Sequence, residues 1–190
     1  GLGDVYKRQY IINGQKVWTS RAEYSDLIML LVKTNQEAKD SKDSLSLFLI
    51  DMRQHLGKEI IIKPIRTMVN HSTTEIFFDN LEVDENCIIG EEGQGFKYIL
   101  SGLNAERLLI ASECIGDAKY FMDKSVEYGN QREVFGRPIG KNQGIQFPVA
   151  KAYSRTFAAE LTLIEGCNLF DSGQDCGKEA NISKLLAAEA

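Results

Sequence analysis

The chain has 190 residues, of which 43% are hydrophobic and 26% are charged, a composition typical of a globular protein with a packed core. Lys and Arg number 22 against 27 Asp and Glu, so the formal net charge is −5, and no basic run or basic helix face stands out. This balance argues against nucleic acid or an anionic membrane as the main partner and favours a small molecule.

The first half of the sequence predicts an antiparallel β domain over residues 10–90. Residues 1–9 carry no strand or helix period that continues into the chain, and we interpret them as a non-native leader. Two β-prone runs flank Asn13-Gly14, the pair that best accommodates a type I′ turn, so Tyr10 to Trp18 is predicted to form a hairpin. Further strands are predicted at Leu27 to Lys33, Ser46 to Asp51, Glu59 to Ile65, Thr74 to Phe78 and Leu81 to Val83, with Asp79-Asn80 as a turn.

The second half, residues 91–190, predicts a bundle of long antiparallel helices. The glycine-rich stretch Gly90 to Gly95 lacks the Lys and Ser/Thr of a phosphate loop and follows no βαβ pattern, so a flexible entry into a helix is favoured over nucleotide binding. Helical periodicity runs from Phe96 to about Gly129, and Arg132 to Gln143 connects it to a second helix. A last helix is expected from Lys178 to Ala190, where no stop signal follows, so we expect an incomplete bundle within an α+β fold.

Two apolar stripes mark the faces of these helices that we expect to be buried. Glu106 falls on the stripe of the first helix, where a carboxylate is costly unless it is paired or used. It is therefore a candidate general base, although an ion pair with a partner from another element would also account for it. The first stripe consists of Phe96, Ile99, Leu103, Ile110, Asp117 and Phe121, and the second of Gln146, Ala150, Tyr153, Phe157, Leu161 and Ile164.

The cysteines predict a reducing compartment. They are far apart in the sequence, with no C-x-x-C pair and only two histidines, so we expect reduced thiols and no metal site. We also expect no secretion signal and no membrane span, because no apolar run approaches the roughly 18 residues that a span needs. The expected location is the cytoplasm, or the mitochondrial matrix in a eukaryote. The cysteines are Cys87, Cys114, Cys167 and Cys176, and the histidines are His55 and His71.

From Tyr10 to Ala190 the chain resembles the acyl-CoA dehydrogenase family. The match rests on five stretches in their order and spacing. These are the Asn-Gly motif leading into Trp18-Thr19-Ser20, FFDNLEVDEN (residues 77–86), IIGEEGQGF (88–96), LNAERLLIA (103–111) and REVFGRPIGKNQGIQ (132–146). The resemblance implies a fragment that holds the family's middle β domain and the first helices of its C-terminal bundle.

The resemblance also implies a reaction. Family members use FAD to remove hydrogens from the α and β carbons of an acyl-CoA: a glutamate takes the α proton and the flavin accepts the β hydrogen as hydride. Glu106 before Arg107 matches the branch in which the base lies on the first bundle helix. A carboxylate in an apolar groove becomes more basic, as a general base near neutral pH requires. Leu103 and Arg107 are then expected to contact the substrate.

The remaining site residues follow from the same resemblance. Trp18 and Ser20 match the tryptophan and hydroxyl residue that lie against the flavin ring, although many relatives read Trp-Ile-Thr where this chain has Trp18-Thr19-Ser20. Arg132, Phe135 and Gln143 match residues that reach the adenosine diphosphate part of FAD held by a neighbouring subunit. We therefore expect a homo-oligomer, a dimer or tetramer, that passes electrons to electron-transfer flavoprotein or a similar acceptor.

Several alternatives stay open at the level of sequence. Trp18 could instead cap the core at a strand end, Arg132 could belong to a charged loop, and Phe135 could be a buried anchor. An acyl-CoA oxidase, or a non-catalytic binding or assembly protein on the same scaffold, would share these motifs. The sequence assigns no role to His71 and does not define the length or branching of the acyl group.

Overall fold

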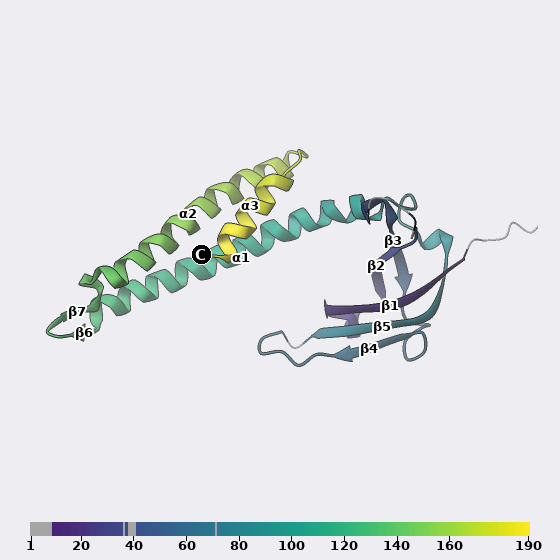
Figure 1. The fold of residues 1–190 in the computed structure, drawn as a ribbon, viewed down its shortest axis with the longest axis horizontal. Coiled ribbons are helices and arrows are strands. Elements are labelled where there is room, and N and C mark those ends of the chain that lie inside the picture. Colours follow the sequence, from purple (N-terminus) through teal and green to yellow (C-terminus); the bar gives the residue numbers. More distant parts are fainter. Residues whose placement is uncertain (1–8, 36, 38–40, 71) are drawn as a thin grey trace, which may run out of the picture. The chain divides into compact units, whose positions relative to one another are not determined.

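The computed structural model describes residues 9–35, 37, 41–70 and 72–190, so the predicted leader except Gln9, and also His71, lie outside the described residues. The chain divides into two compact units, the first ending at Ile99 and the second covering Leu100–Ala190. Antiparallel strands form the first unit and helices the second (Figure 1). The predicted α+β fold class is therefore confirmed.

The first unit holds two antiparallel sheets. One has the strand order β1-β5-β4 and the other pairs β2 with β3. The strands are β1 (Gln9–Ser20), β2 (Leu27–Lys33), β3 (Leu45–Asp51), β4 (Ile60–Pro64) and β5 (Thr73–Asp84). Their inward side chains form one core, in which Phe48 is fully buried and meets the Tyr10 ring edge-on at 5.1 Å between centroids. Burying such side chains stabilises the fold by roughly 1.5–3 kcal/mol each.

The predicted hairpin at Asn13-Gly14 is wrong, because β1 runs through these residues as one strand paired with β5. A bulge accounts for the turn-like motif: Asp79 and Asn80 of β5 together oppose Asn13. Asn80 adopts φ 49°, its backbone N–H donates to Asn13 Oδ1 at 2.8 Å, and Asn13 Nδ2 donates to Asn80 Oδ1 at 3.3 Å. The same bulge replaces the turn predicted at Asp79-Asn80, since β5 also continues through it.

The second unit contains the helices. They are α1 (Gly95–Gln131, which begins in the first unit), α2 (Gln143–Asp171) and α3 (Gly177–Ala188). Small residues bring them together: a Cβ on Gly166 of α2 would lie 2.7 Å from Leu108 Cδ2 of α1. The Lys119–Glu160 ion pair at 2.5 Å links α1 to α2, and Arg155 of α2 donates to the carbonyl of Glu189 at the end of α3 at 3.0 Å.

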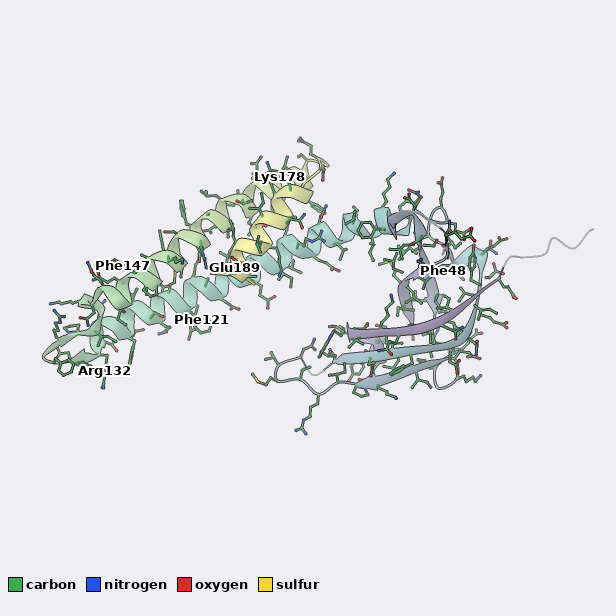
Figure 2. The ribbon with its side chains drawn as sticks, in the orientation of Figure 1. Phe48, Phe121, Arg132, Phe147, Lys178 and Glu189 are labelled. Atoms are coloured by element: carbon green, nitrogen blue, oxygen red, sulfur yellow. The ribbon has the colours of Figure 1, made fainter. Side chains whose placement is uncertain are left out.

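The apolar stripe predicted on α2 lies on the wrong side of that helix for this bundle, and the stripe predicted on α1 does so from Ile110 onward, whereas its first members, Phe96, Ile99 and Leu103, are half-buried. On α1 the buried hydrophobic side chains are those of Leu108, Ala111 and Ile115, whereas Ile110, Phe121 and Glu106 are exposed. Every member of the predicted stripe on α2 is exposed, and α2 buries Thr156, Ala159 and Gly166 instead. Figure 2 shows Phe121 on the side of α1 away from α2, and Phe147 on the side of α2 away from α1. Each helix therefore has a second apolar face, and on α2 the bundle uses the face with smaller residues.

The described part of the chain contains no helix that is long and apolar enough to cross a bilayer. All four cysteines are free thiols. Within the same described ranges, no three His, Cys, Asp or Glu side chains group as metal ligands would.

The loop that leads into α1 is fixed by hydrogen bonds rather than left flexible as we predicted. The Gly93 N–H donates to Ser46 Oγ at 2.8 Å, and the Glu91 N–H donates to the Tyr98 hydroxyl at 3.2 Å. A Cβ on Gly95 would lie 2.5 Å from the backbone nitrogen of Leu47, so this glycine allows α1 to start directly against β3.

Gly95→Ala should therefore destabilise the first unit by about 1–3 kcal/mol, because backbone atoms would have to move. Gly102→Ala is the matched control in the same helix: a Cβ there meets nothing within 4 Å, so alanine should stabilise the helix by roughly 0.5–1 kcal/mol. Urea unfolding followed by far-ultraviolet circular dichroism, which detects the strands of the first unit and the helices of the second, would measure both. Equal effects of the two substitutions would contradict the close approach.

Candidate active site

Trp18 lies at a second bulge, on the strand that ends at Ser20. Lys16 pairs with Ile76 and Thr19 with Thr74, so Val17 and Trp18 together oppose one residue of β5. Trp18 has φ 64° and its side chain is 68% exposed. A bulky residue in the left-handed region is strained, and such strain concentrates at functional sites. The exposed indole also does not cap the core, as the alternative interpretation of Trp18 required.

Ser20 is held beside this bulge by a neighbouring loop. Asn70 Nδ2 donates to Ser20 Oγ at 3.2 Å, and the Arg21 N–H donates to the carbonyl of Ser72 at 2.8 Å. Because Ser20 Oγ accepts from Asn70, its own O–H proton can be donated elsewhere. Sequence reasoning missed Asn70, since no local pattern connects it to a serine fifty positions earlier.

Glu106 occupies the outer face of α1, which we define as the predicted stripe together with Glu106. Its carboxylate is exposed and makes no hydrogen bond or ion pair with any residue that the structure describes. The predicted apolar groove is therefore not formed around it within the described residues, and neither is the alternative ion pair.

The neighbours of Glu106 are engaged with each other. Arg107 donates to Asn104 Oδ1 at 2.9 Å, one turn earlier in α1, and is half-buried, as is Leu103. Asn104 also lies against the start of α3, where its Nδ2 is 3.3 Å from the position of a Cβ on Gly177. Asn104 was not predicted as a site residue, although it belongs to the LNAERLLIA motif. These contacts fix the orientation of the helix turn that carries Glu106.

The segment that we predicted only as a connection contains a hairpin. Phe135 lies in its turn, Arg132 precedes it and Gln143 follows it. β6 (Glu133–Val134) and β7 (Arg137–Pro138) pair across the two-residue turn Phe135-Gly136, whose φ angles are 53° and 74°. Type I′ turns have two positive φ angles, and the glycine was the available signal. A phenylalanine in this conformation is unusual, and Phe135 is fully exposed at the tip instead of being the buried anchor that one interpretation proposed.

The base of this hairpin is tightly fixed. The Ile139 N–H donates to the carbonyl of Arg132 at 2.9 Å, and the Arg137 guanidinium donates to Asn142 Oδ1 at 2.6 Å. A Cβ on Gly140 would lie 2.9 Å from the carbonyl oxygen of Gly129, so the chain passes very close to the end of α1. The side chains of Arg132 and Gln143 are left exposed on either side.

The second unit does not bring Glu106 and this hairpin together. From Glu106 to the end of α1 at Gln131 the helix rises by roughly 38 Å at about 1.5 Å per residue. One copy of the chain therefore presents two separate groups of candidate residues on this unit. A ligand that meets both groups at once would have to be very long or be shared between two copies.

Cys167 of α2 is a poor candidate for a nucleophile. Cys167 packs against the buried cluster of Leu108, Cys176 and Ala180. Burial raises the pKa of the Cys167 thiol, and the negative charge of Asp171 adds to the effect. The thiol therefore stays protonated near neutral pH, which disfavours nucleophilic chemistry.

Family models match most of the chain. Residues 4–81 match the acyl-CoA dehydrogenase middle domain, and residues 93–190 match the acyl-CoA dehydrogenase C-terminal domain. Among curated relatives, an acyl-CoA dehydrogenase of Bacillus subtilis is 32% identical over 96% of this chain and 48% of its own length. A 3-(aryl)acrylate reductase of Clostridium sporogenes is 33% identical over 95% of this chain and 48% of its own length. The chain thus spans about half the length of the curated relatives it matches.

Three solved structures each match 95% of this chain and about half of their own chains. The acyl-CoA dehydrogenase of Geobacillus kaustophilus has a TM-score of 0.74 and 26% identity, covering 95% of this chain and 50% of its own. The complex of glutaryl-coenzyme A dehydrogenase with glutaryl-CoA has a TM-score of 0.77 and 28% identity, covering 95% of this chain and 46% of its own. A structure of an electron transferring flavoprotein of Acidaminococcus fermentans matches with a TM-score of 0.76 and 26% identity over 95% of this chain and 47% of its own.

The close approach of Gly140 to Gly129 predicts that Gly140→Ala will loosen the hairpin that carries Phe135. Hydrogen exchange at the Ile139 amide, which bonds to Arg132, should become at least about tenfold faster, since a shift of roughly 1–3 kcal/mol is expected for overpacking. Gly144→Ala is the control, because a Cβ there meets nothing within 4 Å. Unchanged exchange in Gly140→Ala would show that the glycine contact does not hold the hairpin.

Proposed function

The chain belongs to the acyl-CoA dehydrogenase family, and from this premise we propose that the protein dehydrogenates an acyl-CoA thioester between its α and β carbons to give the 2-enoyl-CoA. The observation that carries the proposal is Glu106, a carboxylate without a partner among the described residues, on a helix face that is otherwise largely apolar. Because the carboxylate is exposed and bonded to no described residue, it can accept a proton from a ligand that covers this face.

The residues of this chain are compatible with FAD as the cofactor. Trp18 offers an exposed aromatic surface, and Ser20 offers a hydroxyl that can still donate a proton, so together they suit a flat heteroaromatic ring with acceptor nitrogens. Arg132 and Gln143 offer exposed donors for a pyrophosphate, and Phe135 offers a free aromatic ring. When bound, FAD would supply the acceptor for the β hydrogen.

Glu106 is proposed to remove the α proton of the thioester. Its carboxylate has no competing partner in the described part of the chain, so it can accept a proton without first breaking an ion pair. Covering the outer face of α1 would remove water from around the carboxylate, favour its neutral form and make it a stronger base. Arg107, held by Asn104, and Leu103 are proposed to position the thioester beside it.

The separation along α1 supports a shared site. Because Arg132 lies roughly 38 Å from Glu106 along the helix, we propose that Arg132, Phe135 and Gln143 contact the adenosine diphosphate part of FAD bound by a neighbouring subunit. The active protein would then be a homo-oligomer, because each site is incomplete in one copy.

The electron acceptor and the cellular compartment are proposed from the relatives. One similar solved structure is described as an electron transferring flavoprotein, and we propose such a flavoprotein as the acceptor. The relatives include bacterial proteins and a mitochondrial one, so the cytoplasm or the mitochondrial matrix is the proposed location. Transfer of electrons to oxygen would instead indicate an oxidase, and oxygen consumption during turnover distinguishes the two.

Glu106→Gln in the full-length protein should lower turnover of acyl-CoA by at least about 100-fold, because general-base catalysis contributes roughly 10²–10⁴. FAD content should stay unchanged, because the amide keeps the size of the side chain. Glu113→Gln, an exposed glutamate two turns further along α1, is the matched control and should keep normal turnover. The substrate in both cases would be a panel of acyl-CoAs, with flavin bleaching measured without oxygen.

If Glu106→Gln kept more than a tenth of the turnover, the assignment of Glu106 as the general base would be wrong. A full-length protein that purifies without flavin, or that no acyl-CoA bleaches, would favour the non-catalytic alternative.

A further inference from the structure

Asn70, which lies between β4 and β5, links the start of β5 to the end of β1 through its side chain. Its Oδ1 lies 3.1 Å from the backbone nitrogen of Ser72 and 3.0 Å from Ser72 Oγ. Its Nδ2 lies 3.2 Å from Ser20 Oγ. One amide group therefore joins two polar residues, and one of them carries the hydroxyl that we assign to the flavin ring.

The partners of Asn70 determine which end of its amide faces Ser20. A backbone N–H can only donate, so the atom 3.1 Å from the Ser72 nitrogen has to be the amide oxygen. The NH₂ end is then the one beside Ser20 Oγ, and an NH₂ group can only donate. Ser20 therefore accepts this hydrogen bond, and its own proton cannot point toward Asn70.

The backbone holds both ends of this bond in place. The carbonyl of Asn70 accepts from the hydroxyl of Thr67 and, at 3.4 Å, from that of Thr73. Thr73 is also the residue of β5 that pairs with Ser20 of β1. The bond between Asn70 and Ser20 thus forms between residues that are already ordered, so it costs little additional conformational entropy.

The proton of the Ser20 hydroxyl is left for another acceptor. Ser20 is exposed, and within the described part of the chain its Oγ has no hydrogen bond besides the one from Asn70. A hydroxyl can accept and donate at the same time. The Asn70 bond thus restricts the directions in which Ser20 can donate and leaves those away from the protein open.

We propose that Asn70 is a positioning residue of the flavin site, which holds the Ser20 hydroxyl as a donor for an acceptor nitrogen of the flavin ring. The inference rests on the proposed function for the contact between Ser20 and FAD. It adds a residue that acts only through Ser20 and needs no contact of its own with the cofactor. Preorganised donors of this kind are effective because they need no reorientation when the acceptor arrives.

Asn70→Asp tests the proposal because it reverses the bond and keeps its shape. One carboxylate oxygen can still accept from the Ser72 N–H, but the other accepts from Ser20, so the Ser20 proton turns toward the aspartate. The readout is the equilibrium of the full-length protein, with bound FAD and without acyl-CoA, against a soluble redox dye. The change that Asn70→Asp causes in this equilibrium constant should differ by about 2- to 10-fold between the original protein and the Ser20→Ala variant, as expected for one hydrogen bond.

Asn35→Asp is the matched control in the same unit. Asn35 also accepts through Oδ1 from the N–H two residues later, that of Glu37, at 3.0 Å, and its side chain has no bond to Ser20. The substitution introduces the same charge in the same kind of turn. It should change the dye equilibrium equally with and without the Ser20 hydroxyl.

A second readout needs no flavin. In the 190-residue chain, Asn70→Ala removes the acceptor of the Ser72 N–H, so hydrogen exchange at that amide should become about 2- to 10-fold faster. Asn70→Asp keeps an acceptor at the same place and should leave the exchange rate within about twofold of the original.

Dependence of the Asn70→Asp effect on Ser20, none for Asn35→Asp, and faster Ser72 exchange in Asn70→Ala would together support the proposal. An Asn70→Asp effect that is equal with and without Ser20, or Ser72 exchange that Asn70→Ala leaves unchanged, would overturn it while the proposed function stands. If Ser20→Ala leaves the dye equilibrium unchanged, or the protein binds no FAD, the flavin contact in the proposed function is wrong and this inference fails with it.

Discussion

The structure depends on one constraint: each of its two long helices has two apolar faces, and the residues that the structure describes cover only one of them fully. The covered face of α2 carries small residues, and Gly166 allows Leu108 of α1 to approach it closely. The outer faces keep the larger side chains, including Phe121 on α1 and Phe157 on α2. Because apolar surface left in water costs roughly 25 cal/mol per Å², both outer faces are places where further protein or ligand should pack.

This constraint determines the environment of Glu106. The residue lies on the outer face of α1, and its neighbours Arg107 and Asn104 bond to each other rather than to its carboxylate. Whatever covers that face will determine how much water reaches the carboxylate and hence how basic it is. The two clusters on the second unit, around Glu106 and around Phe135, are separated by most of the length of α1, so a shared site between copies is the simplest way to use both.

The sequence predicted the fold class well, because alternation and helical periodicity are local properties. It failed where a contact between distant segments decides the structure. Asn13-Gly14 has the composition of a turn, but the hydrogen bonds between Asn13 and Asn80 make it one side of a bulge instead. Periodicity found the apolar stripes of both helices, yet it could not show which of two apolar faces the bundle would bury.

The candidate site was predictable only through its motifs. The resemblance identified Trp18 and Phe135, while their positive φ angles and exposure became visible only in three dimensions. The central claim is that Glu106 removes the α proton of an acyl-CoA, and exchange of that proton in D₂O measures this step directly. The full-length protein should catalyse incorporation of deuterium at the α carbon, and replacement of Glu106 by Gln should abolish it. Exchange at an undiminished rate without the Glu106 carboxylate would contradict the account.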